Sequence, residues 1–148
     1  MPELIPADDD FARQKLTDLE YGLYGAMDVR DRAHSVLVAK LLLDRHPAAH
    51  RNLVAAALLH DVGKSQLKFN AIHRILVHLA RPRGLPQEPL AGGLRGALQL
   101  REHHEAIGAR LLEEAGVDPE VVRLVGNLGR QGAADPDLTV LRWADERT

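Results

Sequence analysis

The 148-residue sequence contains no cysteine, which excludes disulfide bonds, thiolate zinc sites and cysteine nucleophiles together. Aromatic residues make up only 3% of the chain, so a hydrophobic core must be built from aliphatic side chains. The longest apolar run covers residues 53–59 and is too short to cross a bilayer. A phosphate-binding loop is excluded as well, because the GKS at 63–65 lacks the glycine that this motif requires five residues earlier.

An excess of charge of one sign is also lacking, since 19 basic and 21 acidic residues leave a net charge of −2. No overall basic field attracts the chain to nucleic acid or to a membrane surface, and we find no strong signal for either partner. The first ten residues, MPELIPADDD, are acidic where a secretory signal peptide is basic. We therefore expect a cytoplasmic protein that is not associated with a membrane.

The sequence does contain apolar residues at helical spacing along most of its length, without sustained alternation of period two. This pattern predicts an all-α fold, a single bundle of six or seven helices, and the length predicts one domain over residues 1–148. A long loop is expected over 81–96, where proline and glycine accumulate. The expected helices cover about 28–45, 48–61, 70–80, 98–115, 119 to the glycines at 126 and 129, and 136–145.

Local signals predict how several of these helices begin and end. Asp28 is expected to cap the first helix, with Asp31 as its reciprocal cap. Gly63 is expected to stop the helix at 48–61. The apolar face of the helix at 28–45 is predicted to consist of His34, Leu37, Val38, Leu41 and Leu42.

Eight histidines are the compositional oddity of the chain, and two of them, His34 and His60, lie in apolar helix segments. His60 and Asp61 end the most apolar helix, where a buried ionisable pair needs a partner. His34 lies on the apolar face of the preceding helix, and Asp145 lies in the last one. Imidazole nitrogen and carboxylate oxygen are ligands for a divalent transition metal, Mg²⁺ being less suited to imidazole. The residues alone leave open a core histidine, a helix-capping pair and a solvated aspartate instead.

In order and spacing, His34, the segment ALLHDVGK at 57–64 and Asp145 resemble the HD-domain metal-dependent phosphohydrolase superfamily. The segment HHEAIGARLLEEAG at 103–116 also resembles a recurring segment of its bacterial members. The resemblance extends from about residue 28 to residue 145 and implies an HD-domain-like bundle over that core. It implies that His34, His60, Asp61 and Asp145 hold a divalent metal ion, whether Mn, Fe, Co, Ni, Zn or Mg.

The same resemblance implies hydrolysis of a phosphate ester or anhydride by a metal-activated water. The implied substrate is a small phosphorylated molecule, such as a nucleotide. Asp61 is expected to orient the attacking water while it binds the metal. Lys64 is expected to stabilise charge on the phosphoryl oxygens, and His104 to lie at a second metal or at the substrate phosphate.

Two-metal branches of the superfamily carry a further histidine in the next helix, where this chain has Asn127 and Leu128. A complete second metal site is therefore not expected. His104 should face the metal cavity, four residues before Gly108 on the same helix face, and act on substrate or bound water. Two alternatives remain at this point: a catalytically weak nucleotide-binding or regulatory protein that keeps the fold, and a purely structural helical module.

Overall fold

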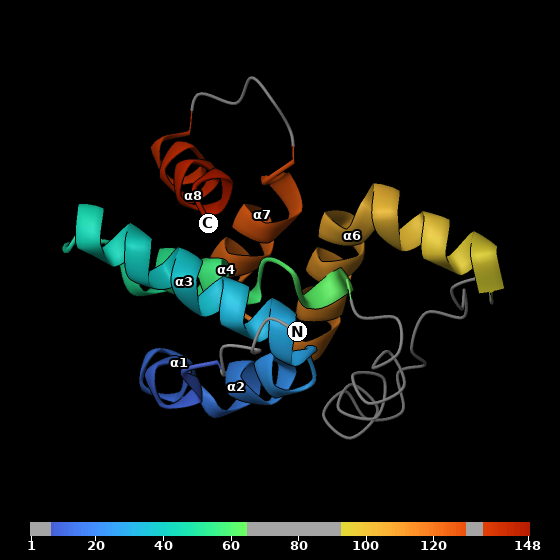
Figure 1. Cartoon of the computed structure of the whole chain (residues 1–148), viewed down its shortest axis with the longest axis horizontal. Helices are drawn as coiled ribbons and strands as arrows, with labels where there is room; N and C mark the ends of the chain where they lie inside the picture. Colours follow the sequence, from blue (N-terminus) through green and yellow to red (C-terminus); the bar gives the residue numbers. More distant parts are fainter. Residues whose placement is uncertain (1–6, 65–92, 130–134) are drawn as a thin grey trace, which may run out of the picture.

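The computed structural model describes residues 7–64, 93–129 and 135–148, which form α-helices and one 3-10 turn but no β-strand (Figure 1). The predicted all-α bundle is confirmed, whereas the helix expected at 70–80 and most of the loop expected at 81–96 lie outside the described residues. No helix of the described part is long and apolar enough to cross a membrane. The elements are α1 Asp9–Lys15, α2 Asp18–Gly25, α3 Val29–Arg45, α4 Arg51–Leu59, η1 Val62–Lys64, α6 Gly93–Ala115, α7 Pro119–Asn127 and α8 Pro136–Glu146.

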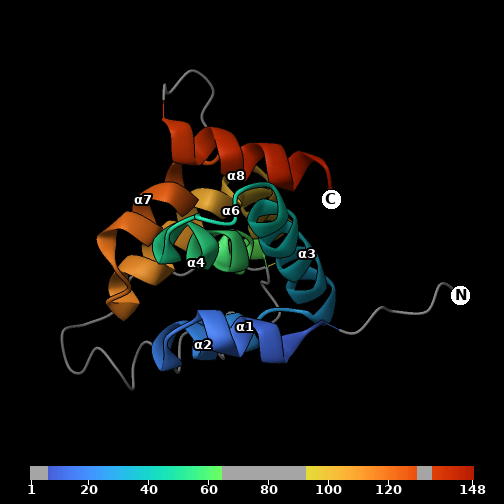
Figure 2. The same ribbon diagram turned by 90° about the vertical axis from the view of Figure 1, so that its left-hand side faces the viewer.

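Helix α4 is the central element of the bundle. Every side chain from Leu53 to Leu59 is buried, and α4 packs against α1, α2, α3, α7 and α8. Figure 2 shows α1 and α2 on one side of α4 and α8 on the opposite side. A helix without a polar face is expected to be enclosed in this way. The chain leaves α4 through His60 and Asp61, which remain buried at 1% and 2% exposure.

Helices α1 and α2 precede the bundle and were not predicted from the sequence. α2 begins with a capping box, in which the Thr17 hydroxyl accepts from the Glu20 N–H and the Glu20 carboxylate accepts from the Thr17 N–H. The buried Glu20 also forms an ion pair with Arg51 at the start of α4. The spacing of Thr17 and Glu20 is the local signal that identifies α2, and their contacts fasten it to the central helix.

The start and the exposed face of α3 differ from the prediction. Asp28 does precede α3, but its side chain makes no capping hydrogen bond, so the predicted reciprocal cap with Asp31 is wrong. Leu37, expected on the apolar face, is 50% exposed, because α3 lies at the edge of the bundle and buries only part of its surface. His34 lies on the partly covered side and is 30% exposed.

Two further helix boundaries are corrected. α4 begins at Arg51 rather than at 48, because Nδ1 of His50 accepts from the Leu53 N–H and caps the helix there. α6 begins at Gly93 rather than at 98, so the last four residues of the predicted loop are helical. At the other end of α6, Gly116 takes the positive φ of 86° that a glycine C-cap requires.

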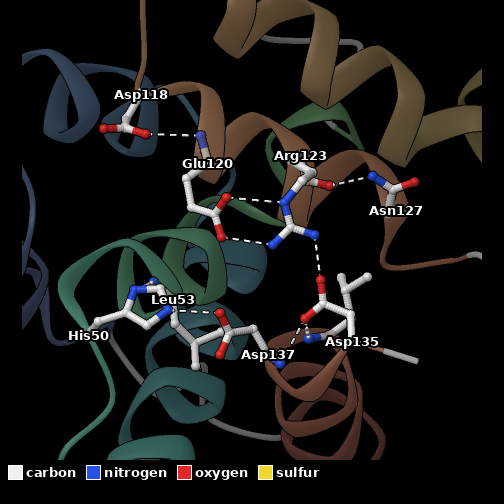
Figure 3. Close-up of polar contacts among 9 residues, drawn as sticks. His50, Leu53, Asp118, Glu120, Arg123, Asn127, Asp135 and Asp137 are labelled. Atoms are coloured by element: carbon white, nitrogen blue, oxygen red, sulfur yellow. Dashed lines mark hydrogen bonds and ion pairs between the residues drawn. The ribbon is translucent and has the colours of Figure 1, made fainter. Parts of the chain in front are cut away.

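The start of α8 is connected to both α7 and α4 (Figure 3). Arg123 of α7 lies 2.5 Å from Asp135, which caps α8 by accepting from the N–H groups of Asp137 and Leu138. Nε2 of His50 lies 2.8 Å from Asp137 in the first turn of α8. These exposed contacts hold the beginning of the helix whose far end carries Asp145.

Candidate metal centre

Three helices bring His34, His60 and Asp145 to one point. His34 comes from α3, His60 follows α4 directly, and Asp145 lies near the end of α8. Oδ1 of Asp145 lies 2.9 Å from Nε2 of His34 and 3.2 Å from Nε2 of His60. One ligand atom from each of the three residues lies within 4.8 Å of the others, which is compatible with a shared metal ion. His34 and Asp145 are 111 positions apart, so only the fold joins them.

Asp61 directs one carboxylate oxygen toward the same point. Its Oδ2 lies 3.3 Å from Nε2 of His60 and 3.9 Å from Nε2 of His34. The structure therefore brings together all four residues that the sequence analysis proposed as metal ligands. Their role as ligands remains a prediction at this stage.

The surroundings of His60 test whether the residues fit a metal ion. Nδ1 of His60 donates to the carbonyl oxygen of Ala57 at 2.7 Å, an assignment that leaves the lone pair on Nε2. A backbone carbonyl commonly orients a metal-binding imidazole in this way. Nε2 of His60 and Oδ2 of Asp61 are both buried, and neither has a hydrogen-bond partner in the described part of the chain. Such orphaned atoms are costly, and a cation between them satisfies both.

The electrostatics of the cluster favour a positive charge at this point. Burial works against the charged form of His60, but the adjacent carboxylates of Asp145 and Asp61 prevail and raise its pKa to about 10. Burial likewise opposes ionisation of Asp61, yet His60 and Lys64 lower its pKa to about 2. His34 and His60 hold the pKa of Asp145 well below its usual value. A divalent ion can take the place of the proton that otherwise sits between these carboxylates.

The second oxygen of Asp61 faces Lys64 and His104 rather than the histidines of the cluster. Its Oδ1 lies 3.2 Å from Nζ of Lys64 and 3.7 Å from Nε2 of His104. Lys64 is exposed, whereas the His104 side chain is only 19% exposed. Asp61 thus stands between the buried cluster and the two residues for which a substrate role was predicted.

Two glycines explain how His104 comes to lie beside Asp61. A Cβ atom on Gly63 would lie 2.1 Å from the carbonyl oxygen of His104 and 2.6 Å from the backbone nitrogen of Gly108. A Cβ on Gly108 would in turn lie 3.2 Å from the backbone nitrogen of Gly63. The backbones of η1 and α6 are therefore in direct contact. The prediction that Gly63 stops α4 is wrong, because the helix ends at Leu59, and the glycine instead permits this close packing.

Two carboxylates near the site were not predicted as site residues. Asp31 lies three positions before His34 and hence on the same face of α3. Burial raises the pKa of Asp31, and the negative charge of Asp61 raises it further, while Lys64 acts in the opposite direction. Oε1 of Glu105 lies 3.2 Å from Nε2 of His104. The spacing from His34 is a signal that could have identified Asp31, but Glu105 is revealed only by the geometry.

The residues at the position of the further histidine provide no imidazole. Asn127 turns back on its own helix, where its Nδ2 donates to the carbonyl oxygen of Arg123 at 2.7 Å (Figure 3). Leu128 is buried in the core at 5% exposure. Neither side chain replaces the imidazole that the two-metal branches carry at this point.

A histidine on one helix, a His-Asp pair after the next and an aspartate on the last helix of an all-α bundle define a protein of the HD-domain class. Members of this superfamily are generally metal-dependent phosphohydrolases. The family profile "Cas3, HD domain" matches residues 25–140, and the chain therefore belongs to this family. Neither the curated proteins nor the solved structures contained a match. Asp145 lies beyond the matched residues, so its place beside the histidines rests on the structure.

Proposed function

We propose that the protein is a metal-dependent phosphohydrolase acting on a phosphate ester or anhydride, with nucleotides as the first candidate substrates. The observation that carries this proposal is the pair of buried, unpartnered atoms, Nε2 of His60 and Oδ2 of Asp61. They lie beside two further metal-binding groups and next to an exposed lysine. Membership of the HD-domain superfamily supports the same reaction class.

Each residue has a role that follows from its position. His34, His60, Asp61 and Asp145 would hold the ion, which would supply charge for the phosphoryl oxygens and acidify a bound water. Imidazole in this set favours a transition metal over Mg²⁺.

Three groups would act on the substrate: Oδ1 of Asp61, Lys64 and His104. Oδ1 of Asp61, which faces Lys64 and His104, would orient the attacking water. Lys64, exposed and 3.2 Å from that oxygen, would bind a phosphoryl oxygen and stabilise the charge that develops there. His104 would donate or accept a proton at the substrate or at a bound water.

A second candidate substrate is a phosphodiester in nucleic acid. The matched family is that of the Cas3 HD domain, and Cas3 HD domains can be nucleases. The net charge of −2 provides no chain-wide attraction to nucleic acid, so such binding would depend on local groups around the site.

The test compares the wild-type protein with His60→Ala after removal of metal and reloading with Mn²⁺, Co²⁺, Ni²⁺ or Mg²⁺. The substrates are p-nitrophenyl phosphate, bis(p-nitrophenyl) phosphate, nucleotides and single-stranded DNA. We expect the wild type to hydrolyse at least one of them only when metal is present. His60→Ala should lose metal and turnover, whereas His46→Ala, at an exposed histidine, should retain both.

The outcomes separate the alternatives. If His60→Ala keeps as much metal as the wild type after mild dialysis, the metal site is elsewhere. If the wild type binds metal and nucleotide but hydrolyses none of the substrates, the protein is a regulatory or nucleotide-binding member of the class. Cleavage of DNA without hydrolysis of nucleotides would favour the second substrate.

A further inference from the structure

We propose that Glu105 is a positioning residue of this site, which holds the His104 imidazole in the orientation that faces Asp61. The inference rests on the proposed function, since it concerns how His104 is presented to a substrate. Three observations carry it: the contacts of the imidazole, the packing of α6 on η1, and the space around the Glu105 carboxylate.

The first observation is that the His104 ring lies between two carboxylates. Its Nε2 is 3.2 Å from Oε1 of Glu105 and 3.7 Å from Oδ1 of Asp61. The longer distance exceeds that of a hydrogen bond, so Asp61 alone does not fix the ring. The shorter distance is within the range of a hydrogen bond. Glu105 is therefore the nearer of the two groups that can determine the rotamer of His104.

The second observation is that the packing of α6 on η1 positions the backbone of His104 but does not by itself orient the ring. The contact of Gly63 with the carbonyl oxygen of His104 sets the position of the main chain. The ring can still rotate about its two side-chain dihedrals. Adjacent helical side chains diverge by about 100°, so the contact between His104 and Glu105 requires both to turn toward a common point. This arrangement distinguishes Glu105 from an ordinary exposed helix residue.

The third observation is that Gly129, two residues after the end of α7, leaves room for the Glu105 carboxylate. A Cβ on Gly129 would lie 3.3 Å from Oε1 and 3.4 Å from Cδ of Glu105. The Glu105 side chain is 26% exposed and rests against this glycine rather than extending into solvent. By comparison, Glu114 on the same helix is similarly exposed at 23% and pairs with Arg110 at 3.2 Å. Glu114 is therefore a matched control that shares the helix but not the site.

The test measures kcat and KM on p-nitrophenyl phosphate and bis(p-nitrophenyl) phosphate with Mn²⁺-loaded full-length protein. Glu105→Ala should lower kcat about tenfold with little change in KM, metal content or melting temperature, because His104 is present but poorly oriented. Glu105→Gln should retain most of the activity, since its amide oxygen can still accept from Nε2. Glu114→Ala should behave like the wild type.

A double-mutant comparison shows whether Glu105 acts through His104. The double variant His104→Ala/Glu105→Ala should be no slower than His104→Ala alone. If Glu105→Ala lowers kcat by the same factor in both backgrounds, Glu105 acts independently of His104 and the proposal is wrong. It is equally wrong if Glu105→Ala and Glu114→Ala have the same kcat.

An NMR measurement that does not require turnover tests this inference independently of the proposed function. In metal-free protein, the His104 ring signal is assigned in ¹H–¹³C spectra by its absence in His104→Ala. We expect Glu105→Ala to shift this signal and Glu114→Ala to leave it unchanged. An unmoved signal overturns the positioning role. If Glu105→Ala shifts this signal while the wild type hydrolyses none of the substrates, the positioning role is supported and the proposed function fails.

Discussion

His60 is almost completely buried, at 1% exposure, among charged groups. Its Nδ1 is committed to the Ala57 carbonyl, and its Nε2 is buried beside the carboxylates of Asp61 and Asp145 without a hydrogen-bond partner. A neutral imidazole would leave the oxygens that face Nε2, Oδ1 of Asp145 and Oδ2 of Asp61, without a positive charge at that nitrogen. Either a proton or a metal ion must therefore occupy this position, and the two compete.

The first prediction is that metal binding releases a proton. The pKa of His60 is raised to about 10 in the metal-free protein, so the ring is protonated at pH 7 and must lose its proton to bind metal. Apparent affinity should rise about tenfold per pH unit between about pH 7 and pH 9. Calorimetry in two buffers of different ionisation enthalpy counts the released protons. An affinity that is constant over this range would contradict the prediction.

The second prediction is that Asp31→Asn stabilises the metal-free protein at neutral pH. Burial and the charge of Asp61 raise the pKa of Asp31, so ionised Asp31 is less favourable in the folded than in the unfolded state. This penalty is complete above the raised pKa, fades as the pH falls through that pKa toward the unfolded value of 3.8, and is absent below 3.8. The melting temperature in chelator should therefore rise at pH 7 and change little at pH 3.

The control for this prediction is Asp44→Asn, an exposed aspartate on the same helix. It should leave the melting temperature nearly unchanged at both pH values, because surface charges contribute little to stability. A lower melting temperature for Asp31→Asn at pH 7 would mean that Asp31 makes a stabilising contact in the ionised form.

At the scale of elements, the contact between η1 and α6 holds together the two segments that carry Asp61 and His104. Gly63 and Gly108 approach each other through their backbones, and this approach places His104 beside Asp61. Backbone atoms cannot move aside as the end of a flexible side chain can. The close packing of η1 on α6 therefore requires glycine at both positions.

The third prediction compares two glycine substitutions. Gly63→Ala would place a Cβ 2.1 Å from a backbone oxygen, so it should destabilise the fold by about 3 kcal/mol or more and weaken metal binding. Gly22→Ala, at an exposed position of α2 with nothing within 4 Å, should instead stabilise by about 0.5–1 kcal/mol. Urea unfolding measures both effects. Equal stability of Gly63→Ala and wild type would disprove the close packing.

At the scale of the whole molecule, the candidate centre joins three helices that are distant in sequence. Its ligands come from α3, from the end of α4 and from α8, and the first and last are separated by 111 positions. An ion at this point can bind only when these helices are packed together. Metal binding and folding should therefore be linked.

The fourth prediction is that Mn²⁺ raises the melting temperature of chelator-stripped protein. A ligand that binds only the folded state adds about 2.7 kcal/mol at a hundredfold excess over its Kd, worth roughly 5–10 °C in a chain of this size. Thermal scans against Mn²⁺ concentration measure the shift. His60→Ala should show almost none of it, and an unchanged melting temperature in the wild type would count against a metal centre.

The sequence by itself determined the helical class, most helix positions and the identity of the four clustered residues. Helical periodicity and capping residues are local properties of the sequence, and Asp118 and Asp135, each followed by proline, cap the starts of α7 and α8. α2 was not predicted, although its capping box at Thr17 and Glu20 is an equally local signal.

The tertiary structure decided what depends on contacts between distant residues. Only packing shows that Oδ1 and Oδ2 of Asp61 face different groups, that Gly63 contacts α6 rather than ending α4, and that Glu105 lies against Gly129. These relations arise because the buried helix α4 fixes where its neighbours lie. A linear sequence does not specify such distances, since they are set by how side chains from separate elements fill one shared core.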